Sequence, residues 1–225
     1  MSENLPKAYK QGWQEFYGRR FLVSREVLIP RPETEMIVDA VLNLVGKSYL
    51  PGVKPGEARI DANGLRILDV GTGSGCVAIT LKLELPDSIV IASDVSDGAI
   101  LIAKKNAKSL GAEVNFIKSD LMSDVDFIPD VVVANLPYVD KNWDWLDKES
   151  LNYEPSLALY ADKNGLELIY KLIEQVAERK IRYLILEADP CQHTDIINYA
   201  EKNGLELVET RGFVLVFTCL NSLRA

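Results

Sequence analysis

RILDVGTGSG (residues 66–75) is the stretch that decides the fold. Its first half, RILDV, is a short and nearly continuous apolar run, which is typical of a strand buried on both faces of a parallel sheet. Glycines then stand at 71, 73 and 75, where the strand turns into a predicted helix. Glycines in such a turn let the backbone approach a ligand closely and leave amide groups pointing outward at a helix N-terminus. A ligand site is therefore expected directly after this strand.

The rest of the chain alternates apolar runs with helical patterns. Strands are predicted at 89–94, 114–120, 131–135 and 182–188, and helices at 76–85, 96–111, 165–180 and 193–204. The alternation predicts an open, doubly wound α/β sheet with its ligand at the C-terminal ends of the strands.

The end of the chain departs from an all-parallel nucleotide-binding fold. LELVET (205–210) and FVLVFT (213–218) are joined by Arg211 and Gly212, so they are close enough to pair antiparallel. We therefore predict a Rossmann-like class I methyltransferase fold: a mostly parallel seven-stranded sheet with an antiparallel last strand.

Two further elements are predicted upstream of the glycine turn. FYGRRFLVSREVLIP (16–30) predicts a β-hairpin that turns near Ser24 and Arg25. RPETEMIVDAVLNLV (31–45) predicts a helix that begins at a proline and carries acids in its first turn, where they complement the helix dipole.

The chain is expected to divide at its one loop-like stretch. That stretch is rich in Pro and Gly and covers residues 51–64. Residues 1–50 would form a short N-terminal segment with the hairpin and helix, and residues 65–225 the main domain.

Composition narrows the partner and the compartment. The chain has 33 acidic and 25 basic residues and a net charge of −8, and its longest basic cluster is Lys104, Lys105 and Lys108 on a predicted helix surface. Nucleic-acid binding draws on clustered Lys and Arg, so DNA or RNA is disfavoured as the main partner. We expect no membrane span, because no run approaches the ~20 apolar residues that a membrane helix needs. The polar start, without an apolar signal core, predicts a cytoplasmic protein.

The residues that most often bind metals are sparse. The three cysteines, Cys76, Cys191 and Cys219, are far apart, and His193 is the only histidine. This spacing supports neither a zinc site nor a disulfide framework, and a lone histidine gives little support to a Ser-His-Asp triad. We expect a metal-free, reduced, intracellular protein.

The spacing of the glycines distinguishes between two cofactor classes. A dinucleotide fingerprint beginning at Gly71 needs Gly or Ala at the position that Cys76 occupies. The G-x-G-x-G spacing of Gly71, Gly73 and Gly75 instead suits S-adenosylmethionine, which has no pyrophosphate to hold. A tight strand–helix turn without a ligand is the plainer alternative for this stretch.

Acidic residues end the next two predicted strands. Asp94 is well placed for two ribose hydroxyls, and Asp120 could accept from an adenine amino group. Taken singly, Asp94 could instead help to begin the helix after Ser96, and Asp120 could form only a turn. Together with the glycine turn they predict one site for S-adenosylmethionine, in which Thr72 and Ser74 join the three glycines.

The fourth predicted strand ends in NLPY, at Asn135, Leu136, Pro137 and Tyr138. Asn and Pro are ordinary turn residues, so a plain turn is one interpretation. The other is a clamp for a planar nitrogen at the same rim as the cofactor. Asn135 and the Leu136 carbonyl would each accept one N–H of the substrate, Tyr138 would stack on it and Pro137 would fix the turn.

With these motifs the chain resembles the HemK/PrmC-like protein-(glutamine-N5) methyltransferases. The segments that carry the resemblance are EFYGRRFLVSREVLIPRPETE (15–35), ILDVGTGSGCVAITL (67–81), SDVS (93–96), NLPYV (135–139) and YEPSLALYADKNGLELIYKLI (153–173). The resemblance implies methyl transfer from S-adenosylmethionine, with S-adenosylhomocysteine as product, to the glutamine of the Gly-Gly-Gln motif of peptide chain release factors. It also implies cofactor binding by residues 71–75 and Asp94, Leu121 beside the adenine, and Asn135 to Tyr138 on the glutamine amide. Asn135 is expected to touch the cofactor as well. The helix start at Glu33 and Glu35 is expected to be structural.

The sequence departs from the family pattern in two places. The family's clamp is usually N-P-P-Y, and Leu136 replaces the first proline; NLPY also resembles the motif of ribosomal RNA adenine dimethyltransferases. Family members typically carry a helical N-terminal domain, whereas about a dozen residues precede the hairpin here, so a separate protein could supply that function. Two alternatives stay open: an N6-adenine methyltransferase acting on RNA or DNA, and a non-catalytic S-adenosylmethionine-binding paralogue.

Overall fold

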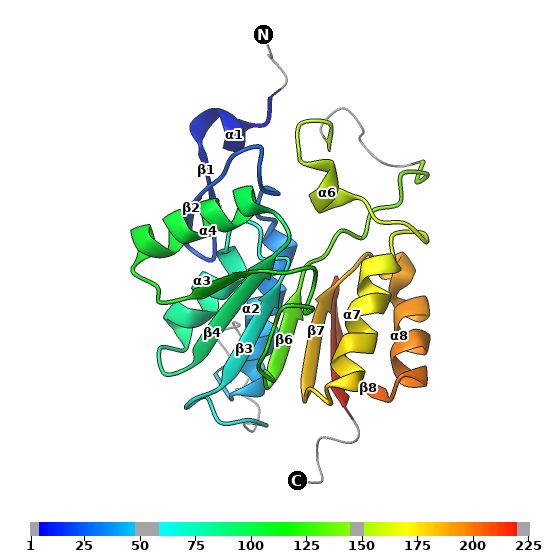
Figure 1. Ribbon diagram of the computed structural model, residues 1–225. Coiled ribbons are helices and arrows are strands. Elements are labelled where there is room, and N and C mark those ends of the chain that lie inside the picture. The colour runs from blue at the N-terminus through cyan, green and yellow to red at the C-terminus, as the bar shows by residue number, and fades with distance from the viewer. Residues whose placement is uncertain (1–4, 48–58, 145–150, 220–225) are drawn as a thin grey trace.

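The computed structural model describes residues 5–47, 59–144 and 151–219 (Figure 1). Its centre is a seven-stranded sheet in the order β5-β4-β3-β6-β7-β9-β8. All pairings are parallel except those of β9, which runs antiparallel to both β7 and β8. The strands are β3 (Arg66–Val70), β4 (Ile89–Asp94), β5 (Asn115–Lys118), β6 (Val131–Ala134), β7 (Tyr183–Glu187), β8 (Leu205–Arg211) and β9 (Val214–Cys219). The predicted sheet and its antiparallel last strand are confirmed.

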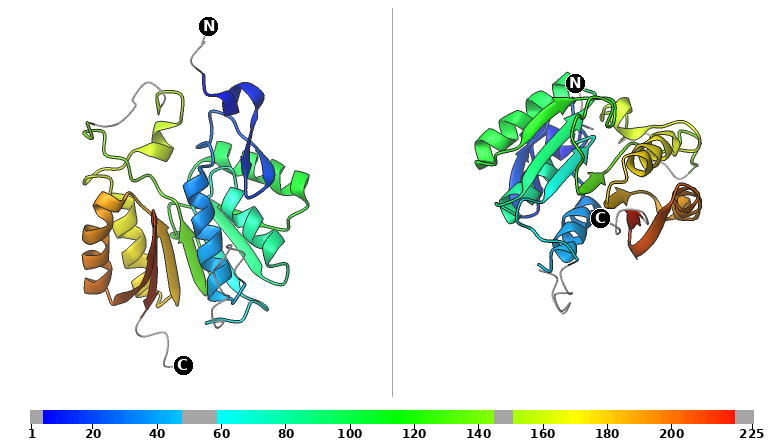
Figure 2. Two further views of the ribbon diagram at one scale, coloured as in Figure 1. Left: turned by 180° about the vertical axis from the view of Figure 1, so that it is seen from behind. Right: turned by 60° about the horizontal axis from the view of Figure 1, so that its bottom comes forward.

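Helices cover both faces of this sheet (Figure 2). One face carries α2 (Glu35–Leu44), α3 (Cys76–Glu84) and α4 (Asp97–Leu110), and the other carries α7 (Glu167–Glu178) and α8 (His193–Lys202). The helix α4 ends as its sequence predicts, because Gly111 is a left-handed C-cap with φ 71°.

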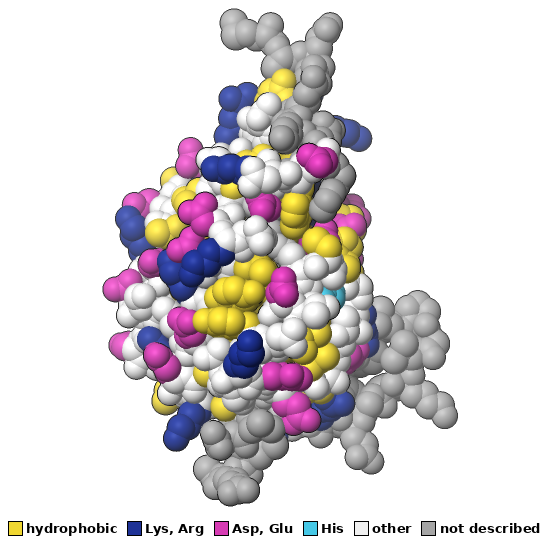
Figure 3. All heavy atoms as spheres, turned by 90° about the vertical axis from the view of Figure 1, so that its right-hand side faces the viewer, with side chains coloured by type: hydrophobic (Ala, Val, Ile, Leu, Met, Phe, Trp, Pro, Cys, Tyr) yellow, Lys and Arg dark blue, Asp and Glu magenta, His cyan; other side chains and the backbone are white. Residues whose placement is uncertain are grey.

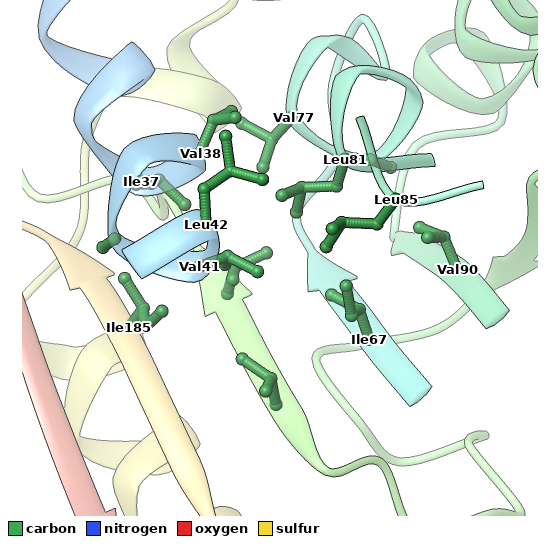
Figure 4. Close-up of a cluster of buried hydrophobic side chains, with 14 of the residues drawn as sticks. Ile37, Val38, Val41, Leu42, Ile67, Val77, Leu81, Leu85, Val90 and Ile185 are labelled. Carbon is green, nitrogen blue, oxygen red and sulfur yellow. The ribbon is translucent and has the colours of Figure 1, made fainter. Parts of the chain in front are cut away.

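The strands alternate their side chains between two apolar layers. Ile67, Val131 and Ile185 belong to the layer under α2 and α3, whereas Leu68 and Val132 belong to the layer under α7 and α8. This period of two is what a strand buried on both faces requires. Figure 4 shows the first layer, where the labelled side chains are Ile37, Val38, Val41, Leu42, Ile67, Val77, Leu81, Leu85, Val90 and Ile185.

A short hairpin precedes the sheet, as predicted, but it turns elsewhere. Its strands are β1 (Trp13–Phe16) and β2 (Arg19–Leu22), and α1 (Lys7–Gln11) comes before them. The predicted turn near Ser24 and Arg25 is therefore wrong. The chain reverses at Tyr17 and Gly18, which both have positive φ (50° and 70°), as the two-residue turns that suit the twist of a hairpin require. Ser24 instead begins a separate turn, where its carbonyl accepts from the Val27 N–H at 3.1 Å.

Side-chain hydrogen bonds attach the hairpin to the main domain. Asn106 of α4 is buried; its Oδ1 accepts from the Leu22 N–H at 2.7 Å, and its Nδ2 donates to the carbonyls of Leu22 and Ser74 at 3.0 and 2.8 Å. Glu35 Oε1 accepts from the Tyr17 N–H at 2.6 Å, so this acid holds the hairpin turn. The predicted helix start at Pro32 is confirmed. The segment begins as the 3₁₀ turn η1 (Pro32–Thr34) and continues directly as α2.

The remaining elements lie above the C-terminal ends of the strands. The short helix α6 (Ser156–Leu159) and the hairpin lie on opposite sides there (Figure 1). A parallel bridge between Val139 and Tyr160 ties the segment after β6 to the end of α6. The 3₁₀ turn η2 (Pro190–Gln192) connects β7 to α8. The division of the chain at 51–64 stays a prediction, and residues 51–58 of that loop lie outside the described residues. No helix within the described ranges is long and apolar enough to cross a membrane.

Candidate functional site

A cavity of about 420 Å³ opens at the C-terminal ends of β3, β4 and β6. That volume is in the range of small-molecule sites, and the place is where doubly wound sheets bind ligands. The hairpin–helix connection forms one wall and the segment before and within α6 forms another. The predicted site residues that line it are Gly71, Thr72, Gly73, Ser74, Asp94, Asp120, Leu121, Asn135, Leu136 and Pro137. Gly75 and Tyr138 are not among the lining residues.

Each of the three glycines of the turn is required for a different structural reason. Gly71 has φ 73°, and a Cβ there would lie 3.0 Å from Leu136 Cδ2. Gly73 has φ 54°, and a Cβ there would meet no atom within 4 Å, so it would occupy cavity space. Gly75 is the N-cap of α3, where a Cβ would lie 2.8 Å from Ile79 Cδ1. Glycine is therefore required at position 75 by the close packing against α3. At position 73, the lack of a side chain leaves space in the cavity.

Asp94 holds the glycine turn and keeps acceptor capacity. Its Oδ2 accepts from the Gly73 N–H at 2.9 Å and its Oδ1 from the Ser96 N–H at 2.9 Å. Burial raises the pKa of its carboxyl group, and the backbone hydrogen bonds oppose that rise. A carboxylate has about four lone-pair sites, so acceptor capacity remains for ligand hydroxyls.

Asp69 is a cavity residue that the sequence analysis did not select. It is buried at the end of β3, where its Oδ2 accepts from Thr72 Oγ1 at 2.7 Å and from the Ala78 N–H at 3.2 Å. Burial raises its pKa to about 6. The signal was present in the sequence, because an acid within an otherwise apolar buried strand needs a partner.

The segment after β5 brings Asp120 and Leu121 to the cavity. The strand ends at Lys118, two residues before the predicted end, so Asp120 lies in the following turn. Leu121 is buried with φ 52°, an uncommon conformation for a residue with a side chain. Its carbonyl accepts from Ser93 Oγ at 3.2 Å, which secures this backbone beside β4.

The NLPY turn divides between the cavity and the core. Asn135 Nδ2 donates to Thr34 Oγ1 at 2.9 Å. Leu136 is buried against the glycine turn, and Pro137 lines the cavity. Tyr138 donates from its hydroxyl to Glu187 Oε1 at 3.2 Å, and burial raises its pKa. The expected stacking of Tyr138 on a substrate stays a prediction.

Two residues far along the chain fix the backbone of this turn. Gln192 Nε2 donates to the Tyr138 carbonyl and to the Asn164 carbonyl, both at 2.8 Å. Gly165 lies so close that a Cβ there would be 1.9 Å from the Tyr138 oxygen. Any side chain at 165 would therefore displace the turn. Neither residue carried a signal in the sequence for this role.

Glu187, at the end of β7, is buried behind the NLPY turn. Burial raises its pKa to about 7, and the negative charge of nearby Glu33 adds to the rise. Hydrogen bonding by the side chains of Thr34, Tyr138 and Asn135 lowers the pKa in part. Among the described residues, its Oε2 has no partner with full hydrogen-bond geometry. An acid buried in this way directly behind the residues of a site is a candidate for a functional role.

An ion pair joins the two walls of the cavity. Arg31 and the largely buried Glu154 form it, and Glu154 Oε2 also accepts from the Ile29 N–H at 3.1 Å. The two segments lie 123 residues apart in the sequence. They belong to VLIPRPETE and YEPSLAL, so two of the stretches that carry the family resemblance meet each other here.

Comparison with known proteins agrees with this geometry. Residues 58–146 match the family model described as "Methyltransferase small domain". A release factor glutamine methyltransferase of Neisseria gonorrhoeae is 40% identical over 211 residues, which cover 91% of this chain and 71% of that protein. The chain belongs to the release factor glutamine methyltransferase family. A second member, from Koribacter versatilis, is 43% identical over 178 residues, which cover 77% of this chain and 58% of that protein.

Solved structures place the fold of this family member among methyltransferases. The hMettl16 catalytic domain in complex with the MAT2A 3′UTR hairpin 6 aligns with a TM-score of 0.64 at 19% identity, covering 93% of this chain and 87% of that one. Magnesium protoporphyrin IX methyltransferase from Synechocystis PCC 6803, with bound SAM, aligns with a TM-score of 0.55 at 19% identity, covering 83% of this chain and 79% of that one. The predicted class I methyltransferase fold and the predicted family are confirmed.

Proposed function

We propose that this chain transfers a methyl group from S-adenosylmethionine to the side-chain amide nitrogen of a glutamine in a peptide chain release factor. The observation that carries the proposal is the shared cavity. Asn135 and Pro137 line it together with Asp94 and the open position at Gly73. Family membership supplies the substrate class.

The glycine-turn residues fit the cofactor. Gly73 leaves space where a side chain would stand, and Asp94 offers its remaining lone pairs to the two ribose hydroxyls. Leu121 presents an apolar side chain for the adenine, and Asp120 an acceptor for its amino group. Bound S-adenosylmethionine supplies an activated methyl group.

The NLPY residues act on the acceptor. A glutamine amide nitrogen is a poor nucleophile because its lone pair is delocalised. Asn135 Oδ1 and the Leu136 carbonyl accept its two N–H groups, which orients the nitrogen and stabilises the positive charge that develops on it. Neither acceptor is a base at neutral pH. One proton therefore passes to water only after methylation, when the charged nitrogen is strongly acidic.

An N6-adenine methyltransferase is the competing proposal, because an adenine amino group is also a planar nitrogen and NLPY suits both. The net charge of −8 argues against it. On the face seen in Figure 3, the coloured basic and acidic side chains are interspersed rather than gathered in a basic stripe. Weak nucleic-acid affinity at physiological salt is expected from the net negative charge.

Labelled methyl transfer tests the proposal. The chain and radiolabelled S-adenosylmethionine are incubated in three parallel reactions, each with one acceptor: a release factor, a structured RNA or a duplex DNA. Label in the release factor alone is expected. Label in RNA or DNA with none in protein would favour the adenine reaction, and cofactor binding without any transfer would favour a non-catalytic paralogue. We further propose a cytoplasmic location, where release factors act; a separate partner protein stays a prediction.

A further inference from the structure

The side chain of Thr34 is buried but does not serve its own helix. Thr34 is the N-cap residue of α2, yet its hydroxyl makes no capping hydrogen bond. That hydroxyl instead accepts from Asn135 Nδ2 at 2.9 Å, across 101 residues of sequence. A threonine at a helix start usually bonds the backbone of its first turn. Here the side chain is committed to the NLPY turn.

The proton of the Thr34 hydroxyl needs an acceptor. The Thr34 and Asn135 side chains lie close enough to the Glu187 carboxylate to lower its pKa, and among the described residues Glu187 Oε2 has no hydrogen-bond partner. Glu187 Oε1 already accepts from Tyr138. If Thr34 donates to Glu187, its oxygen is left as an acceptor and requires an N–H from Asn135. The reverse orientation of the Asn135 amide would leave the buried carboxylate short of a donor, which is costly.

We propose that Thr34 and Glu187 are positioning residues that hold the Asn135 amide with its oxygen toward the acceptor substrate. This inference rests on the proposed function. In this arrangement Asn135 donates to Thr34 and Thr34 donates to one oxygen of Glu187. Tyr138 donates to the other carboxylate oxygen. The segment PRPETE (30–35) thereby sets which end of the Asn135 amide faces the substrate. Among the described contacts, this segment makes no other hydrogen bond to the NLPY turn.

That orientation of the amide has a consequence for specificity. With Oδ1 forward, Asn135 accepts an N–H from a glutamine amide or another amino nitrogen. With the amide reversed, two NH₂ groups would face each other, and the site would favour a carboxylate or carbonyl oxygen instead. Thr34 and Glu187 therefore select for a substrate that presents hydrogen-bond donors.

A double-mutant cycle in methyl transfer tests the inference. Thr34→Val removes the hydroxyl and keeps the branched shape, whereas Thr34→Ser keeps the hydroxyl and serves as the matched rescue. We expect Thr34→Val to lower kcat about tenfold with cofactor affinity unchanged, and Thr34→Ser to restore most of it. In the Asn135→Ala background, Thr34→Val should have little further effect. An equal loss in both backgrounds would mean that Thr34 acts only through general structure and would overturn the inference.

A second measurement does not depend on any substrate. In ¹⁵N-labelled protein, the side-chain NH₂ signals of Asn135 are assigned by their loss in Asn135→Ala. In the wild type these protons should exchange slowly with solvent, and Thr34→Val should speed their exchange at least tenfold while Thr34→Ser does not. Unchanged exchange in Thr34→Val contradicts the inference. If exchange responds as expected but no release factor is methylated, the proposed function fails and the positioning stands.

Discussion

The two sides of the cavity are built in different ways. The glycine-turn side comprises Gly71–Ser74, Asp94 and Leu121, and its hydrogen bonds join near neighbours: Thr72 to Asp69 across 3 residues and Gly73 to Asp94 across 21. The NLPY side is held across 101 residues by Thr34 and across 49 and 54 by the partners of Tyr138. On the proposed function, cofactor binding depends on the consecutive elements from β3 to the turn after β5, whereas acceptor binding depends on the N-terminal segment and the end of β7. Variants should separate the two.

Asn135→Ala should produce the largest effect and confine it to the NLPY side. Methyl transfer to a release factor should fall about a hundredfold or more, as when one preorganised catalytic hydrogen-bonding group is removed. Affinity for S-adenosylmethionine, measured by calorimetric titration, should change little. Near-normal transfer with intact cofactor binding would reduce NLPY to an ordinary turn.

Asp94→Ala should affect the opposite side. Cofactor affinity should weaken by roughly tenfold or more, because hydrogen bonds to a charged group contribute about 1.5–3 kcal/mol. Asp97→Ala is the matched control, since Asp97 is an exposed acid on the same segment that pairs only with Lys118 among its described ion pairs. Calorimetry giving equal affinities for the two variants would remove Asp94 from the site.

Glu187 should make the NLPY side respond to pH. Its pKa is raised from 4.5 to about 7 in the folded protein, so folding is more favourable when it is protonated. The stability that this provides is complete below about pH 4.5 and is lost as pH rises through 7; the change is about 3 kcal/mol. Denaturation of wild type and Glu187→Gln at several pH values measures it, because only the wild type should show this component. Asp69, whose pKa is also raised, stays the same in both proteins.

Turnover should move in the opposite direction to stability over this window. Ionised Glu187 accepts from Thr34 and Tyr138, whereas the protonated acid becomes a donor and disturbs the chain that orients Asn135. The groups facing it are Tyr138 and Asn135 after β6, Thr34 and Glu33 from η1, and the apolar Val214 of β9. We expect wild-type kcat to rise with pH through about 7 and Glu187→Gln to flatten that rise. A pH profile identical in both proteins would count against this role.

Leu136→Pro should have the smallest effect on turnover. Proline supplies the same carbonyl acceptor, and Pro137 already biases residue 136 toward an extended conformation. Turnover should stay within about tenfold, a barrier change no larger than ~1.4 kcal/mol. Leu136 is buried against Gly71, so some loss of stability is expected as well. A much larger loss of turnover with unchanged stability would show that the leucine side chain itself contributes to the reaction.

The same contrast between local and long-range contacts explains which features could be predicted from the sequence. The sheet, the glycine turn and Asp94 follow local patterns, because strand period, turn glycines and strand-end acids act over a few residues. The hairpin turn was predicted at the wrong place because both Tyr17–Gly18 and Ser24–Arg25 are compatible with a turn. The chain reverses at Tyr17 and Gly18, which adopt the paired positive φ angles of a two-residue hairpin turn. Thr34, Glu187 and Gln192 escaped notice, since only the folded sheet brings them to NLPY and neither periodicity nor spacing records such contacts.

Mass spectrometry of the methylated product tests the central claim most directly. A release factor is incubated with S-adenosylmethionine and either wild type or Asn135→Ala, then digested, and the peptide that contains the Gly-Gly-Gln motif is fragmented. The account predicts one methyl group on the glutamine side chain with the wild type and at most a trace with Asn135→Ala at the same cofactor saturation. A methyl group on any other residue, or equal methylation by both proteins, would contradict it.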